Sequence, residues 1–141
     1  MRGWLVVLGL ALASPAAAQG TIDGVWRDDG GYVEITVGPC AALASGPSGR
    51  CGRITRIIRM KPGETDRDRH NDNPTLRQRP ILGITILSGL IWRDGAWRGR
   101  VYNPEDGGTY RAEVRPGARG TLEVKGCLGF ICRTKVWPSA R

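Results

Sequence analysis

The amino-acid sequence predicts an all-β fold, an eight-stranded antiparallel up-and-down barrel in a single domain. Short segments alternate apolar and polar residues, as in GYVEITV, which places Val33, Ile35 and Val37 on one face. A period of two residues is typical of half-buried strands. Gly, Pro, Asn and Asp separate these segments, and no long stretch follows the helical period. The patterning therefore favours strands joined by turns.

Several of the turns between the expected strands are explicit. Asp-Gly pairs stand between alternating segments in RDGA at 93–96 and PEDGG at 104–108, which is a strong hairpin signal. Eight strands in up-and-down order close into a barrel that removes exposed sheet edges. Such a barrel is filled by side chains or holds one small ligand. The expected strands are 24–28, 31–38, 51–59, 83–92, 96–103, 108–115, 120–127 and 132–137.

The N-terminal residues follow the three-part plan of a secretory signal peptide. Arg2 precedes an apolar run at 4–13, and the small residues at 16–18 form a cleavage site. The run is too short to cross about 30 Å of hydrocarbon, so no membrane span is expected. We predict that residues 1–18 are a signal peptide and that 19–141 form one β-barrel domain, periplasmic or secreted.

The four cysteines predict two disulfide bonds. An even number of cysteines in a small exported domain is typical of a disulfide framework. Of the three possible connectivities we predict Cys40–Cys51 and Cys127–Cys132, because each closes a short local loop. A zinc site is the alternative. Neither pair has C-x-x-C spacing and the chain has one His, so no metal site is predicted.

One segment does not fit a tight turn. KPGETDRDRHNDNPTLRQRP, residues 61–80, lacks strand alternation, and long loops in small domains are usually functional or disordered. Asn73 and Pro74 predict the start of a short helix that ends near Gln78. The acidic residues resemble half a calcium loop but lack its Gly and its final Glu. We expect a solvated, internally salt-bridged flap across one barrel mouth.

YNPEDGGTY, at 102–110, is the stretch that looks most like chemistry. Glu105 and Asp106 are sequence neighbours at an exposed tip, which is a poor setting for acid–base catalysis. Pro104 and the Asp-Gly pair predict a hairpin turn instead. No Ser stands in a Gly-x-Ser-x-Gly setting, and His70 is the sole imidazole. We predict no enzyme, no catalytic residue and no cofactor.

The formal net charge of +8 is compatible with anionic partners. The basic residues are scattered singly rather than gathered into an arm, which favours solubility as their main role. An oligonucleotide-binding barrel stays the third hypothesis.

A Gly-x-Trp opens the first strand (GVW, 24–26) and an Arg lies on the last (CRTKVW). In lipocalin-type barrels this pairing closes the base, with the guanidinium stacked on the indole. Trp26 and Arg133 are therefore predicted to close the barrel.

Six segments together carry a resemblance to a known family. GVW, PC…CGRI, DNPTLRQRPILGITILSGL, GRVYNPEDGGTYRAEV, LEVKGCLGF and RTKVW stand in one order along the chain. In this the sequence resembles the bacterial domain-of-unknown-function family 2147, over about 23–137. The resemblance implies small exported proteins with a lipocalin-like β-barrel, no settled activity and binding of a small apolar molecule. The stretch between Cys40 and Cys51 departs from it by being longer.

The sequence thus favours an exported lipocalin-like barrel that binds a small apolar or amphipathic ligand in its interior. The alternative is a cavity-less module that binds an envelope protein or inhibits an enzyme through its loops. The partner is accordingly a small ligand or an envelope protein rather than a nucleic acid. The ligand-binding candidates are Ile84, Ile86, Trp92, Trp97, Val101, Tyr110 and Ala112.

Overall fold

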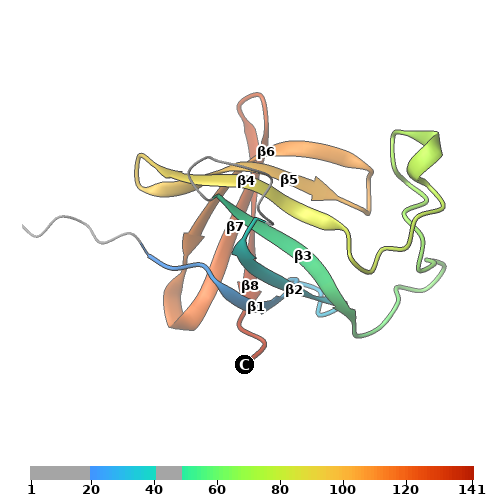
Figure 1. The fold of residues 1–141 in the computed structure, drawn as a ribbon, viewed down its shortest axis with the longest axis horizontal. Coiled ribbons are helices and arrows are strands. Elements are labelled where there is room, and N and C mark those ends of the chain that lie inside the picture. The colour runs from blue at the N-terminus through green and yellow to red at the C-terminus, as the bar shows by residue number, and fades with distance from the viewer. Residues whose placement is uncertain (1–19, 41–48) are drawn as a thin grey trace, which may run out of the picture.

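A single eight-stranded antiparallel sheet, in which each strand pairs with the next along the chain, forms the protein (Figure 1). The computed structural model describes residues 20–40 and 49–141. The sequence therefore predicted the all-β class, the strand number and their order correctly. The strands are β1 (Gly24–Arg27), β2 (Val33–Pro39), β3 (Arg50–Ile57), β4 (Thr85–Arg93), β5 (Ala96–Asn103), β6 (Gly108–Pro116), β7 (Thr121–Leu128) and β8 (Ile131–Pro138).

The sheet curls on itself, and its first and last strands meet at one end. Trp26 forms an isolated bridge with Ser139, and the Ala140 amide donates a hydrogen bond to the Val25 carbonyl over 2.9 Å. Because β1 has only four residues, it reaches the end of β8 but not its beginning. The barrel is therefore closed by backbone pairing at one end only.

The strand order sorts the connections onto two ends of the barrel. The β2–β3, β4–β5 and β6–β7 connections lie with the β1–β8 bridge, and we call this the closed end. The β1–β2, β3–β4, β5–β6 and β7–β8 connections lie at the opposite, open end. At the closed end the β4–β5 turn uses Asp94 and Gly95, whose φ angles are +50° and +76°, as an Asp-Gly hairpin requires.

The packed core lies toward the closed end. Trp97 is buried, its indole donates a 3.0 Å hydrogen bond to the Gly20 carbonyl, and Trp92 meets it edge-on at 5.8 Å. Because its N–H has a hydrogen-bond acceptor, the large indole ring can be buried in the core. The fully buried aliphatic side chains around it include Ile22, Leu87, Leu90, Val114 and Leu122.

The long β3–β4 connection lies at the open end, and the helix in it is shorter than the sequence predicted. Its helical part is the 3₁₀ turn η1 (Pro74–Leu76), capped by the Asn73 side chain, which accepts from the Thr75 amide at 3.1 Å. The cap and Pro74 lie where the sequence predicted them, but the helix ends before Gln78. The segment extends from the open end of the barrel (Figure 1), and its residues Lys61, Glu64 and Thr65 border the barrel interior there.

Both predicted disulfides are confirmed: Cys40 is bonded to Cys51 and Cys127 to Cys132. The first lies at the closed end and the second joins β7 to β8 directly beneath their connection. The predicted signal peptide, 1–18, and most of the loop inside the first disulfide lie outside the described residues. No helix in the described part of the chain is long and apolar enough to cross a membrane.

Candidate binding cavity

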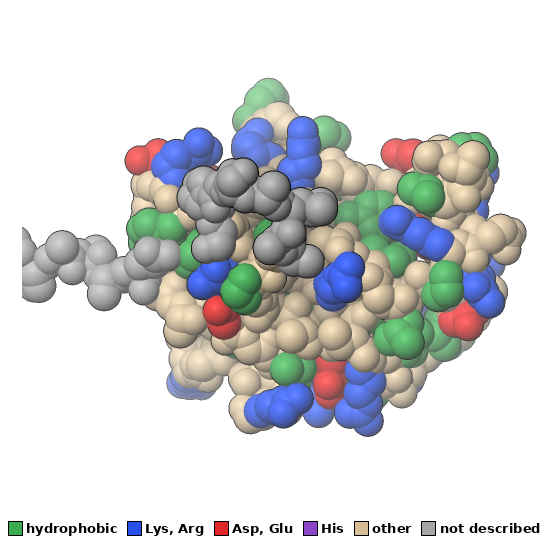
Figure 2. Space-filling view, in the orientation of Figure 1, with side chains coloured by type: hydrophobic (Ala, Val, Ile, Leu, Met, Phe, Trp, Pro, Cys, Tyr) green, Lys and Arg blue, Asp and Glu red, His purple; other side chains and the backbone are tan. Residues whose placement is uncertain are grey.

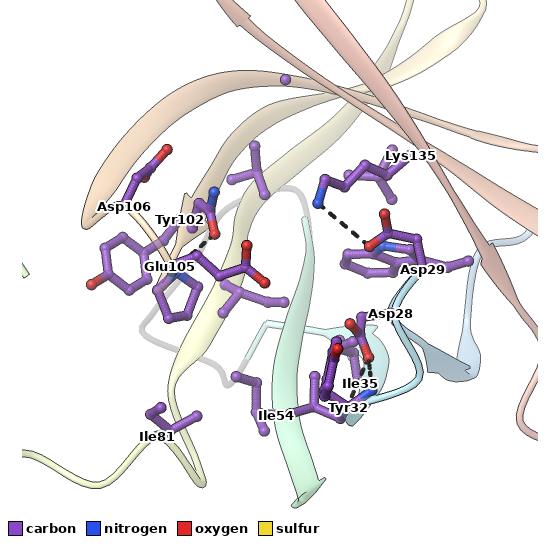
Figure 3. Close-up of a pocket in the computed structure, with 18 of the residues that line it drawn as sticks. Asp28, Asp29, Tyr32, Ile35, Ile54, Ile81, Tyr102, Glu105, Asp106 and Lys135 are labelled. Carbon is purple, nitrogen blue, oxygen red and sulfur yellow. Dashed lines mark hydrogen bonds and ion pairs between the residues drawn. The ribbon is translucent and has the colours of Figure 1, made fainter. Parts of the chain in front are cut away.

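The open end of the barrel contains a cavity of about 720 Å³ (Figure 3). It is bordered by side chains from strands β2 to β8 and from three of the four connections at that end, those between β1 and β2, β3 and β4, and β5 and β6. Its volume lies inside the range of about 300–1,000 Å³ that is usual for small-molecule sites. The barrel interior is therefore hollow in its open half and packed in its closed half.

The deep part of the cavity is apolar. It is built from alternate residues of neighbouring strands, because every second side chain of a strand points to the same face of the sheet. Ile35 and Ile54 are buried and face each other as partners in the β2–β3 register. The other apolar side chains of the floor are Ile86, Val101, Val124 and Trp137.

Trp137 contributes an unusual polar atom to this floor. Its side chain is buried, and its Nε1–H has no hydrogen-bond partner in the described part of the structure. A buried polar group without a partner costs free energy. Trp97, the other buried indole, makes the hydrogen bond that Trp137 lacks.

The rim of the cavity is charged, and most of its charges are paired. Lys135 on β8 contacts Asp29 of the β1–β2 turn at 3.4 Å, across the seam that the short β1 leaves open (Figure 3). Lys61 binds Glu105 on the opposite connection. The hydrogen bond that Lys61 donates to Glu105 raises the pKa of Lys61 above its ordinary value, so Lys61 stays charged.

The β1–β2 turn supplies an aromatic wall to the rim. The Asp28 carboxylate accepts hydrogen bonds from the Tyr32 and Val33 amides at 2.6 and 2.8 Å, which fixes the turn. Arg59 and Lys61 lie over the Tyr32 ring, 4.7 and 5.0 Å from its centroid. Cation–π contacts of this kind hold the start of the long connection against the mouth.

Arg133 is the exception among the charged groups of the rim. It lies on β8 opposite Gly126, borders the cavity and is exposed. It makes no hydrogen bond or ion pair with any residue that the structure describes, although its charge lowers the pKa of Tyr110 slightly. The net shift of that pKa is upward, because Tyr110 donates a hydrogen bond to Asp106. The rim therefore has one guanidinium group without an ion pair, at the mouth of a cavity with an apolar floor.

A buried polar network anchors the long connection to β5. Asp68 is 0% exposed, and its carboxylate accepts hydrogen bonds from Tyr102, Asn71 and Arg79. Burial, followed by the hydrogen bond to Asp68, raises the pKa of Tyr102 to about 12. The sequence predicted a solvated, internally salt-bridged loop here. The ion pair between Arg79 and Asp68 is present at 2.8 Å, but the Asp68 carboxylate is buried rather than solvated.

Gly107 shows how closely the long connection packs on the β5–β6 turn. Its φ is +76°, and a Cβ at this position would lie 1.8 Å from the His70 carbonyl oxygen. Only glycine fits both demands. YNPEDGGTY is thus a hairpin turn, as predicted, and also the base against which residues 61–80 rest.

The structure separates the predicted ligand-binding residues into two groups. Ile86, Val101 and Tyr110 border the cavity. Ile84, Trp97 and Ala112 are buried in the core, and Trp92 packs against it, so none of these four borders the cavity. The tryptophans flank the β4–β5 turn, which lies at the closed end. Alternation along a strand predicts its inward face but does not reveal which end of the barrel is hollow.

The predicted closure by Trp26 and Arg133 does not match the geometry. Trp26 pairs with Ser139, whereas Arg133 lies six residues earlier, roughly 20 Å along an extended strand. The cation–π contacts found among the described residues do not include this pair. The Trp26 indole instead donates to the Ile22 carbonyl at 3.0 Å. Arg133 belongs to the open end.

Sequence reasoning missed most of the rim. Asp28, Asp29 and Arg59 belong to connections, although the expected strands 24–28 and 51–59 had included Asp28 and Arg59, and no periodicity marks an inward position there. Gly126 was also missed. It borders the cavity, and a Cβ there would meet only Val101 and Tyr110, at 3.4 and 3.7 Å. The described residues contain no group of three potential metal ligands.

A curled up-and-down sheet with one closed and one hollow end defines a lipocalin-like barrel. The chain belongs to the bacterial family described as "Uncharacterized protein conserved in bacteria (DUF2147)", which matches residues 24–139. Among solved structures it is similar to protein HP1028 from Helicobacter pylori, described as belonging to the lipocalin family. That match has a TM-score of 0.64 at 22% identity and covers 87% of this chain and 85% of the other. No curated protein matches the chain.

Proposed function

We propose that the protein binds a single-chain amphipathic molecule with a negatively charged head group. The observation that carries this proposal is the cavity of about 720 Å³, apolar at its floor and charged at its rim. The apolar chain leaves water for the floor formed by Ile35, Ile54, Ile86 and Val101. Removal of apolar surface from water supplies about 25 cal/mol per Å².

Arg133 is the group that receives the head. The other cations at the rim are engaged: Lys135 with Asp29, Lys61 with Glu105, and Arg59 with the Gly30 carbonyl at 2.8 Å. Arg133 alone among these needs no existing contact broken before it binds an anion. A charge-assisted hydrogen bond from a guanidinium is stronger than a neutral one, and its planar fork suits a carboxylate or phosphate.

The proposed setting is the periplasm or the exterior of the cell. Two disulfides in a small domain suit an oxidising compartment, and residues 1–18 have the composition of a signal peptide. Residues 19–141 are then the mature, single-domain protein, which binds its ligand without catalysis. The alternative of a cavity-less docking module does not fit a hollow barrel.

A substitution that fills the cavity tests the proposal. Gly126→Leu adds a side chain over the floor without a positive φ to oppose it. Gly38→Leu is the matched control, since it adds the same side chain to β2 at a position with nothing within 4 Å. We expect the apolar probe N-phenyl-1-naphthylamine to bind the wild type and Gly38→Leu, and Gly126→Leu to lose at least tenfold in affinity. Equal binding by all three proteins contradicts the proposal.

The charge of the head group is tested separately. We expect Arg133→Gln to weaken binding of the anionic probe 8-anilinonaphthalene-1-sulfonate about two- to fivefold, the modest effect of a solvent-exposed charge pair. Binding of the neutral naphthylamine probe should stay unchanged in the same variant. Equal losses for both probes would assign Arg133 a packing role instead.

A further inference from the structure

The β7–β8 connection carries the most exposed apolar side chains described. Phe130 is 96% exposed, and Leu128 and Ile131 are 69% and 68% exposed. The connection projects from the top of the barrel in Figure 1, and Figure 2 shows hydrophobic side chains at that point with Lys and Arg side chains just below. We call the segment 128–131 the apolar tip.

The exposure of the tip is enforced by its covalent structure. Cys127 and Cys132 form a disulfide immediately beneath it, and Gly129 turns the chain with a φ of +59°. The Arg111 guanidinium donates a 2.9 Å hydrogen bond to the Gly129 carbonyl. The disulfide and this hydrogen bond hold the backbone of the turn, and the three apolar side chains that it carries lie largely in solvent.

Cations surround the base of the tip. Arg111 lies under Gly129, and Arg133 follows the second cysteine on β8. No acidic residue stands between Gly126 and the end of the chain. The segment that forms the tip is therefore apolar at its point, and the charged side chains that it carries on β8 are all positive.

We propose that the apolar tip docks the protein on an anionic lipid bilayer. The three side chains insert at the headgroup level, and the Arg111 guanidinium beneath them meets the lipid phosphates. Basic residues near an anionic membrane surface are attracted to it, and apolar side chains beside them add buried area. The surface recognised is a bilayer of acidic phospholipids rather than an individual lipid.

The size and shape of the tip favour a bilayer over a protein partner. An aromatic side chain buries about 150–250 Å², so one Phe with a Leu and an Ile buries less than about 750 Å², below the roughly 800 Å² per partner of a stable protein interface. A single convex point also lacks the flat surround that such an interface needs. A bilayer accepts an isolated convex point, because lipids rearrange around it.

The tip also lies on the rim of the cavity. Leu128 and Ile131 border the cavity as well as the tip, so docking brings the mouth close to the membrane surface. The inference does not depend on a ligand in the cavity. It stands on the exposed side chains, the disulfide and the neighbouring cations.

Vesicle co-sedimentation tests the inference. The disulfide-intact wild type is mixed with vesicles of phosphatidylcholine alone or with 30 mol% phosphatidylglycerol. The test variant is Leu128→Ser/Phe130→Ser. The control variant is Ile91→Ser/Val136→Ser, which removes two exposed apolar side chains near the closed end, 42% and 49% exposed. Equal thermal midpoints of test variant and wild type establish that both are folded.

We expect the wild type and the control variant to sediment with the anionic vesicles and the test variant to bind at least tenfold more weakly. Binding should weaken at 0.5 M salt, because the phosphate contacts are screened. Three results overturn the inference: no sedimentation of the wild type, equal binding by the test variant, or equal binding to neutral vesicles. Self-association in solution that the test variant abolishes also overturns it, since the tip then contacts a second copy.

Discussion

The two ends of the barrel differ in packing, charge and the length of their connections. The closed end has the backbone bridge between β1 and β8, the buried Trp97 and a tight Asp-Gly turn. The open end has the cavity, the charged rim, the long connection 58–84 and the apolar tip. One sheet thus combines a conventional core with a hollow half.

The shortness of β1 explains how this difference arises. Four residues pair with one end of β8 only, and the rest of β8 faces an open seam crossed by the Lys135–Asp29 ion pair. An exposed ion pair contributes at most about 1 kcal/mol. Stability should therefore come from the closed end, and changes at the open end should affect binding more than folding.

The largest loss of stability is expected for a substitution in the core of the closed end. Trp97→Ala should lower the free energy of unfolding by about 3–5 kcal/mol, because it removes a buried aromatic side chain and leaves a void. Val101→Ala at the cavity should cost only about 1 kcal/mol, since its side chain is half-buried beside space that is already empty. Urea denaturation of both variants measures the contrast. Equal losses would mean that the two ends contribute alike.

The two disulfides provide the next contrast. Replacing Cys40 and Cys51 by Ser should cost about 3 kcal/mol and replacing Cys127 and Cys132 about 2 kcal/mol, because chain entropy favours the longer loop, 11 residues against 5. The second pair should also free the apolar tip, which amide hydrogen exchange at 128–131 would detect. Unchanged exchange there would mean that other contacts hold the tip.

A smaller effect is expected where the long connection is anchored. Tyr102→Phe removes a hydroxyl that donates to Asp68, at a cost of about 1–2 kcal/mol at neutral pH. Burial and the hydrogen bond to Asp68 raise the pKa of Tyr102 to about 12, against about 10 in an unfolded chain. The folded state therefore keeps a proton that the unfolded state loses, and this stabilisation is lost as the pH rises from 10 to 12.

Denaturation midpoints between pH 9 and pH 12 measure that difference. The stability of the wild type should fall more steeply than that of Tyr102→Phe, and the two curves should converge at the alkaline end. Parallel curves would show that the Tyr102 hydroxyl does not contribute to the pH dependence of stability. Other alkaline groups, Lys61 among them, act on both proteins and cancel in the comparison.

The sequence predicted those features that local chemistry determines. Alternation of apolar and polar residues predicted the inward residues Ile86 and Val101, and Asp-Gly pairs predicted the turns. The short sequence separations between cysteines predicted both disulfides. Those features depend on neighbours in the chain, so a sequence contains them.

The predictions that were wrong concern features that depend on residues far apart in the sequence. Asp68 is buried because Tyr102, 34 residues away, donates to it, and nothing near Asp68 in the sequence marks that contact. Arg133 was assigned to the closed end because a strand pattern does not fix how far β1 extends along β8. The position of the hollow half could not be predicted either, because alternation along a strand does not distinguish a filled interior from an empty one.

The smallest expected effect distinguishes the two buried indoles. Trp97→Phe removes an N–H that donates to the Gly20 carbonyl, so it loses both packing and a hydrogen bond. Trp137→Phe removes an N–H without a described partner, so the gain from deleting a buried unpaired donor offsets the loss of packing. We expect Trp137→Phe to lie within about 1 kcal/mol of the wild type and Trp97→Phe to be destabilised by about 1–2 kcal/mol more. Urea midpoints with equal slopes measure the difference. Equal destabilisation would show that the Trp137 indole is satisfied in solution and that the cavity floor is as well packed as the closed end.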